Sequence, residues 1–110
     1  MNQLNSVILE GNIVDTIKND SVLGLTLAVT RHYKNADGEV ADDVSYFDIE
    51  TYDKLAEFAE KQSEKGRGVR VVGRLKQNRW TDDDGKTRAK VFIVAEHIEF
   101  KPFLKKAEEN

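Results

Sequence analysis

The sequence predicts an all-β domain, a five-stranded Greek-key barrel with one α-helix between the third and fourth strands. Three observations support this prediction. Five segments alternate apolar and polar residues with the period of two that is typical of strands. One segment, between the third and the fourth of them, changes to the spacing of a helix. Two of the connections carry the Asn, Asp and Gly residues that favour tight hairpin turns.

The first two strands are expected near the N-terminus. The first has apolar character on both faces, in the alternating series Val7, Leu9, Gly11, Ile13 and Ile8, Glu10, Asn12, Val14. In the second, residues 22–33 (VLGLTLAVTRHY), leucine and valine occupy the odd positions from 23 to 29, and small or polar residues occupy the even positions from 24 to 30. Residues 35–39 (NADGE) then predict a turn, because Asn, Asp and Gly tolerate the positive φ of tight hairpins.

The third strand and the helix follow. Residues 44–51 (VSYFDIET) place Tyr46, Asp48 and Glu50 on one face and Phe47 and Ile49 on the other.

After this strand the apolar residues adopt the i, i+3, i+4 spacing of a helix, at Leu55, Phe58 and Ala59. Thr51 is the expected N-cap, and Gly66 or Gly68 is the expected left-handed stop. The segment therefore predicts a helix of about three to four turns.

Residues 70–80 (RVVGRLKQNRW) return to the period of two. One face is apolar, with Val69, Val71 and Leu75, and the other is charged or polar, with Arg70, Arg74, Lys76, Asn78 and Trp80. Residues 81–85 (TDDDG) predict a second hairpin turn, and residues 88–100 form a fifth strand rich in β-branched and aromatic residues. This order of elements is that of the OB-fold.

Length and composition narrow the class of protein. The chain of 110 residues fits one domain, expected over residues 1–103, with a short charged tail at 104–110. It has no cysteine, and His32 and His97 are too far apart to suggest a zinc pair, so we expect no disulfide, metal or cofactor. Without a signal peptide or a run of about 20 apolar residues, the expected location is the cytoplasm, in association with the nucleoid.

The net charge of −3 argues mildly against a nucleic-acid partner until the charges are placed along the chain. Acidic residues dominate residues 37–64, and basic residues dominate residues 66–90. Such segregation allows a local positive surface, because exposed charges farther apart than about 8–10 Å interact weakly in physiological salt. Solvated faces of unrelated strands remain the alternative interpretation.

Trp80 is the single tryptophan of the chain and lies within the basic segment. By residue type alone, a tryptophan is expected to be largely buried. Strand alternation instead places Trp80 opposite Val69 and Val71 and beside Arg74. An aromatic ring among cations suits a surface on which bases stack while Lys and Arg hold phosphates. Candidate phosphate contacts are Arg70, Arg74, Lys76, Arg79 and Arg88.

At these motifs the sequence resembles the bacterial single-stranded DNA-binding proteins. The resemblance covers residues 5–12, 25–39 and 46–61, and it is most specific in GVRVVGRLKQNRWTDDDGK, residues 68–86. It implies an OB-fold that assembles into homo-oligomers, usually homotetramers, and binds single-stranded DNA without sequence preference in replication, recombination and repair. The family's base-stacking aromatic positions fall on Tyr33, Tyr46, Tyr52 and Trp80.

Three of these aromatic residues have an alternative role. Tyr33 shares the alternation of the core leucines, so the second strand must leave the barrel before Tyr33 can face solvent. Tyr46 shares a face with Asp48 and Glu50, which disfavour phosphate binding, and Tyr52 can pack at the start of the helix.

The sequence also departs from the family pattern. Phe47 stands where the family commonly has a polar residue that supports the subunit interface, which leaves open the choice between dimer and tetramer. The printed sequence closes on KPFLKKAEEN, residues 101–110, without the family's usual acidic, hydrophobic tip. Either the sequence is truncated there, or this protein does not recruit replication and repair proteins through such a tip.

The first and fifth strands are apolar on both faces, with Phe92, Val94 and Ile98 on one face of the fifth. This exceeds what one small barrel buries, and it predicts a homo-oligomer, most simply a tetramer.

Three other classes of protein fit the sequence less well. A primosome accessory protein has the same fold and acts as a dimeric adaptor, but the four aromatic positions and the segment around Trp80 favour the single-strand binder. An OB-fold used only for protein contacts would leave the basic strand merely solvated. An enzyme is disfavoured, because no nucleophile is paired with a base and the TDDDGK segment is better explained as a turn than as a metal site.

Overall fold

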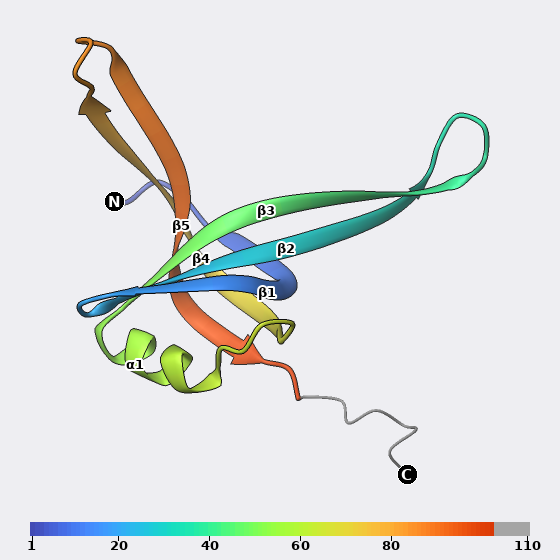
Figure 1. Cartoon of the computed structure of the whole chain (residues 1–110), viewed down its shortest axis with the longest axis horizontal. Helices are drawn as coiled ribbons and strands as arrows, with labels where there is room; N and C mark the ends of the chain where they lie inside the picture. Colours follow the sequence, from blue (N-terminus) through green and yellow to red (C-terminus); the bar gives the residue numbers. More distant parts are fainter. Residues whose placement is uncertain (103–110) are drawn as a thin grey trace.

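The computed structural model describes residues 1–102 and shows five strands and one helix in the predicted order (Figure 1). The elements are β1 (Val7–Asn19), β2 (Val22–Lys34), β3 (Val40–Tyr52), α1 (Asp53–Gln62), β4 (Gly68–Thr81) and β5 (Thr87–Phe100). The strands form a closed barrel in the order β1-β2-β3-β5-β4, so the predicted fold class is confirmed. The charged tail predicted at 104–110 lies outside the described residues.

The barrel closes through one short parallel contact. Neighbouring strands pair antiparallel except β3 and β5, which pair in parallel at Ile49 with Ile93 and at Glu50 with Val94. β4 then pairs back to β1 from Gly68 to Gly73. Because β3 and β5 share so few residues, the hairpins that contain them are free to diverge beyond this contact.

Side chains that alternate inward form the core of the barrel. Its buried members are Ile13, Leu23, Leu25, Leu27, Ile49, Ala56, Ala59, Val69, Val71, Ile93, Ala95 and Ile98. The helix contributes its two alanines and covers one end of the barrel (Figure 1). Most of the odd-numbered residues predicted to face inward in β2 and β4 are therefore confirmed.

Two long hairpins extend from the barrel in different directions (Figure 1). We call residues 30–44 the β2–β3 arm and residues 75–91 the β4–β5 arm; nearly all of their side chains are exposed. The arms arise because the strands have 13 or 14 residues, about twice the usual length. Leu75, predicted to share the core with Val69 and Val71, is instead 47% exposed because β4 has left the barrel there.

The helix begins and ends differently from the prediction. Its N-cap residue is Tyr52, without a side-chain cap, and Asp53 has a positive φ of 53°. The predicted cap Thr51 is fully buried, and its hydroxyl donates to the carbonyl of Leu23 at 2.9 Å. The helix ends at Gln62, and Gly66, with φ of 90°, shapes the following loop, where its N–H donates to the carbonyl of Ile13.

Candidate nucleic-acid interface

The pairing register of β4 and β5 defines the surface around Trp80. Directly opposed residues of an antiparallel pair lie on the same face, and Trp80 pairs with Arg88, Asn78 with Lys90, Lys76 with Phe92 and Arg74 with Val94. We call Arg74, Lys76, Asn78, Trp80, Arg88 and Lys90 the tryptophan face. Trp80 is 49% exposed and lies outside the core, as strand alternation predicted.

The outer face of β3 lies next to the tryptophan face. Tyr46 is 66% exposed on β3 and shares its face with Asp48 two residues later. The carboxylate of Asp48 forms an ion pair with Lys90, with Oδ2 and Nζ 3.1 Å apart. This contact joins β3 to the base of the β4–β5 arm, so Tyr46 and the tryptophan face belong to one side of the molecule.

Tyr52 lies half-buried at the junction of β3 and α1. Its hydroxyl donates a hydrogen bond to the carboxylate of Glu50. This bond, with smaller effects of burial and of the Glu50 charge, raises the pKa of Tyr52 to about 12, and the positive charge of Arg74 acts in the opposite sense. The Tyr52 hydroxyl therefore stays protonated to a higher pH than an ordinary tyrosine, although it lies near Arg74 of the tryptophan face.

Tyr33 lies apart from the other three aromatic residues. It pairs with Ala41 in the β2–β3 arm, whereas Tyr46 pairs with Ala28, so alternation puts the two tyrosines on opposite faces of this hairpin. Tyr33 is 39% exposed because β2 has left the barrel, and the guanidinium of Arg31 lies 5.6 Å from its ring centroid. The structure does not bring Tyr33 together with Trp80.

The five residues predicted to contact phosphate also lie on different surfaces of the molecule. Arg74, Lys76 and Arg88 lie on the tryptophan face, whereas Arg79 pairs with Ala89 on the opposite face of the arm. The sequence analysis did not predict Lys90 as a phosphate contact. Lys90 follows Arg88 by two residues in the same strand and therefore lies on the same face, which could have identified it.

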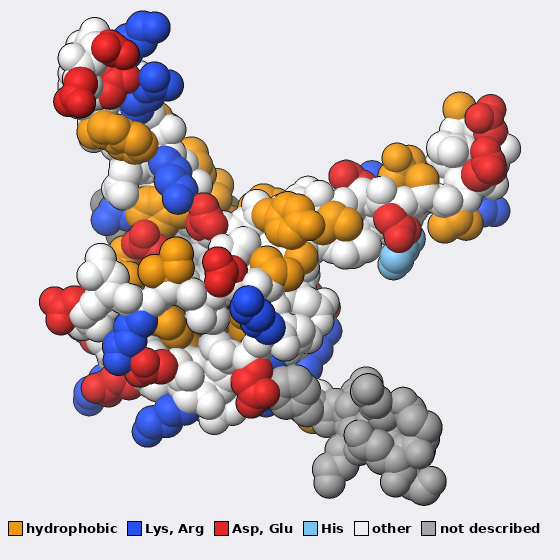
Figure 2. Space-filling view, in the orientation of Figure 1, with side chains coloured by type: hydrophobic (Ala, Val, Ile, Leu, Met, Phe, Trp, Pro, Cys, Tyr) orange, Lys and Arg blue, Asp and Glu red, His pale blue; other side chains and the backbone are white. Residues whose placement is uncertain are grey.

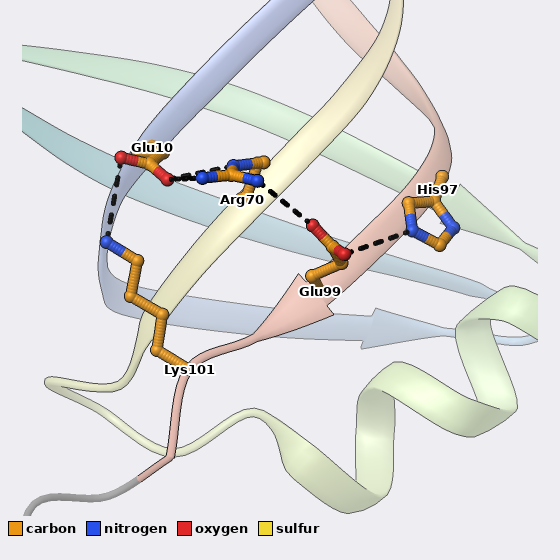
Figure 3. Close-up of polar contacts among 5 residues, drawn as sticks. All are labelled: Glu10, Arg70, His97, Glu99 and Lys101. Atoms are coloured by element: carbon orange, nitrogen blue, oxygen red, sulfur yellow. Dashed lines mark hydrogen bonds and ion pairs between the residues drawn. The ribbon is translucent and has the colours of Figure 1, made fainter.

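Arg70 belongs to a different surface. It lies in a network of ion pairs between charged residues of β1, β4, β5 and the segment after β5 (Figure 3). Arg70 contacts Glu10 at 2.6 Å and Glu99 at 3.4 Å; Lys101 approaches Glu10 at 3.6 Å and His97 approaches Glu99 at 3.9 Å. The hydrogen bond between Arg70 and Glu10 lowers the pKa of that carboxyl group and raises the pKa of Arg70.

Most cations of the tryptophan face already contact a carboxylate. Arg74 contacts Glu96 at 3.0 Å, and Arg88 contacts Asp82 at 2.7 Å. Glu96 is available because a register shift in the β4–β5 ladder leaves it without a partner across from Gly73 and Val72.

Asp82 also accepts the backbone N–H groups of Asp84 and Lys86, which holds the turn together. The hydrogen bond from Arg88, followed by that from the Lys86 backbone, lowers the pKa of Asp82.

An apolar groove of about 440 Å³ lies where the two arms separate. Its apolar lining includes Val7, Leu9, Phe47, Leu75, Val91 and Ile93. Figure 2 shows hydrophobic side chains at the bases of both arms with charged side chains among them. Phe47, Leu75 and Val91 are all exposed, so the groove is an uncovered extension of the inward-facing residues of the barrel.

Within residues 1–102, no group of side chains is arranged to hold a metal ion. The described part of the chain also has no helix long and apolar enough to cross a bilayer.

The closed five-stranded barrel with its helix after β3 and a solvent-facing strand surface places the chain among the OB-fold proteins, a class whose strands and loops bind oligonucleotides and oligosaccharides. The sequence profile of the Single-strand binding protein family matches residues 4–101. The chain belongs to this family.

Its relatives include single-stranded DNA-binding proteins of several bacteria. The protein of Aquifex aeolicus is 42% identical over 77 residues, which cover 70% of this chain and 52% of the relative. The single-stranded DNA-binding protein 2 of Chlorobaculum tepidum is 30% identical, with 91% of this chain and 72% of the relative covered. The chain thus spans about half the length of the Aquifex protein.

Solved structures support the same fold. A Plasmodium falciparum protein in complex with single-stranded DNA matches with a TM-score of 0.78 at 21% identity, covering 93% of this chain and 98% of that chain. A deletion variant of the single-stranded DNA-binding protein of Thermus aquaticus matches with a TM-score of 0.76 at 26% identity, covering 91% of this chain and 51% of the other.

Proposed function

We propose that this protein binds single-stranded DNA without sequence preference and protects it during replication, recombination and repair. The observation that carries the proposal is the half-exposed ring of Trp80 on a strand face that also presents Arg74, Lys76, Arg88 and Lys90. Aromatic stacking tolerates every base, and cations that track the backbone supply affinity that does not depend on sequence. The names of the relatives agree with this function.

In this proposal the four aromatic residues have different roles. Trp80 and Tyr46 are the main stacking surfaces because both are well exposed on one side of the molecule. Tyr52 is held by Glu50 and offers only part of its ring. Tyr33 contacts the strand only where DNA passes around the β2–β3 arm, because it lies on the other face of that hairpin.

The test uses Trp80 as both probe and target. Adding oligo-dT is expected to quench its fluorescence, and Trp80→Ala is expected to cost about 1–3 kcal/mol of binding, measured by anisotropy of labelled oligo-dT. Urea unfolding of the same variant should show a loss well below the roughly 3–5 kcal/mol of an emptied core site. A large loss of stability with unchanged affinity per folded molecule would place Trp80 in the core and remove the main support.

We also propose that the protein is a homo-oligomer, with a second copy covering the part of the apolar groove that Leu75 and Val91 line, while Tyr46, which also lines the groove, stays open to DNA. Phe92, Val94 and Ile98, which the sequence analysis counted toward assembly, are buried within the chain, so they do not support it. Ile8, Val14 and Val91, which belong to β1 and β5, are exposed and do support it, together with Leu75. Of these residues, Leu75 and Val91 line the groove.

Light scattering at tens of micromolar should give at least a dimer. A tetramer is the expected form for a single-strand binder, and a dimer would favour the primosome adaptor. A module for protein contacts alone would leave oligo-dT unbound.

A further inference from the structure

The cations of the tryptophan face differ in whether they are available to a ligand. Arg74, Arg88 and Lys90 each contact a carboxylate within 3.1 Å, whereas Lys76 has no ion pair within the described residues. The three carboxylates come from three separate elements: Asp48 from β3, Glu96 from the irregular part of β5, and Asp82 from the turn after β4.

Each carboxylate contacts a cation that a phosphate would also contact, and neutralises part of its positive charge. A guanidinium or ammonium group offers its N–H bonds equally to carboxylate and phosphate oxygens. Arg88 donates through Nε to Asp82 and Arg74 donates through Nη1 to Glu96. A strand that binds these cations must therefore displace the carboxylate, or bind through the remaining donors of a cation whose charge the carboxylate already partly neutralises.

We propose, on the basis of the proposed function, that Asp48, Asp82 and Glu96 are built-in competitors for phosphate and set the affinity of the tryptophan face. The Arg74–Glu96 and Lys90–Asp48 pairs are exposed on both sides, and Arg88 is exposed although Asp82 is half-buried in the turn. Solvent therefore screens all three pairs, and a strand can compete with each carboxylate. DNA releases a counterion at each phosphate it pairs, but the freed carboxylate takes up a cation from solution. The salt dependence of binding is therefore shallower than the number of cations on the face predicts.

The turn after β4 supplies a matched pair of variants. Asp82→Asn removes the competitor of Arg88, and the amide oxygen can still accept the backbone N–H groups of Asp84 and Lys86. Asp83→Asn removes the same charge from the same turn, and Asp83 has no ion pair among residues 1–102. The two variants therefore have equal net charge and differ in whether Arg88 is released.

The experiment titrates labelled oligo-dT into the unaltered chain and both variants over a range of salt concentrations. Asp82→Asn should raise the affinity about two- to fivefold, the fold-change that corresponds to an exposed ion pair, and should steepen the salt slope by up to about 0.7. Asp83→Asn should change both quantities much less. A second pair of variants repeats the test at Arg74. Glu96→Gln, which removes the carboxylate that contacts Arg74, should raise the affinity and steepen the salt slope as Asp82→Asn does, and Glu57→Gln on the helix is its control.

The outcomes separate this inference from the function on which it rests. If the unaltered chain binds oligo-dT and Asp82→Asn equals Asp83→Asn, only net charge matters and the competitor role is overturned. Weaker binding by Asp82→Asn than by Asp83→Asn would also overturn it, because Asp82 would then be positioning Arg88 for phosphate. If the unaltered chain does not bind oligo-dT, the proposed function itself fails.

Discussion

Glu50 and Tyr52 form a hydrogen-bonded pair next to Arg74 that makes a testable pKa prediction. Glu50→Gln should lower the pKa of Tyr52 from about 12 toward its ordinary value of 10.0, because the charged acceptor is the largest cause of the shift. The pKa is measured from the ring resonances of Tyr52 by NMR. Asp48→Asn, one step earlier on the same face, is the control and should leave the titration of Tyr52 nearly unchanged.

The sign of the stability effect follows from the direction of this shift. Since the folded-state pKa of Tyr52 is raised, the bond to Glu50 contributes stability that is complete below about pH 10 and is lost as the pH rises through about 12. The stability difference between the unaltered protein and Glu50→Gln should therefore shrink over that range. A difference that grew with pH would contradict the assignment.

Gly73 allows the β4 and β5 backbones to approach closely beside the register shift. A Cβ atom at this position would lie 2.1 Å from the carbonyl oxygen of Val94, so the backbone would have to move. Gly73→Ala should destabilise the protein by about 1–3 kcal/mol in urea unfolding. Gly24→Ala is the matched control in β2, where the nearest atom would be 3.6 Å away, and it should unfold close to the unaltered protein.

At the level of elements, the cations of the β4–β5 arm lie on two opposite faces of the hairpin. Lys76 lies on the tryptophan face without an ion pair in the described region, and Arg79 lies on the opposite face. Lys76→Ala should flatten the salt slope of oligo-dT binding by about 0.7, the value for one phosphate contact. Arg79→Ala, which removes the same charge, should change the slope less. Equal effects would mean that the strand contacts both faces of the arm.

The whole molecule is more extended than its length requires. Its radius of gyration is 16.9 Å, compared with about 13 Å for a compact chain of this size, because both arms project from the barrel (Figure 1). Exposed apolar residues lie along the arms and at their bases. Such surfaces are typical of chains that complete their packing by association.

The groove therefore makes a prediction about assembly. Leu75→Asp should lower the mass measured by light scattering, because it would bury a charge where the second copy packs. Val40→Asp is the control: Val40 is also exposed and apolar but lies near the tip of the β2–β3 arm, outside the groove. The fold of the single chain should survive both changes because neither side chain is buried in it. An unchanged mass for Leu75→Asp would remove the groove from the interface.

The sequence by itself determined the five strands, the helix, the hairpin turns at residues 35–39 and 81–85, and the exposure of Trp80. These features depend on local alternation and turn chemistry, which act between residues that are close in the chain. Alternation also separated Trp80 from Val69 and Val71 correctly, because β4 keeps its period from the barrel into the arm.

Only the tertiary structure decided which residues act together. The lengths of the arms, the exposure of Leu75 and the separation of Tyr33 from Trp80 depend on where each strand leaves the barrel. The ion pair between Asp48 and Lys90 depends on a contact between strands that are distant in the sequence. Local periodicity assigns a residue to a face, but the pairing of strands and the point at which they diverge decide what that face meets.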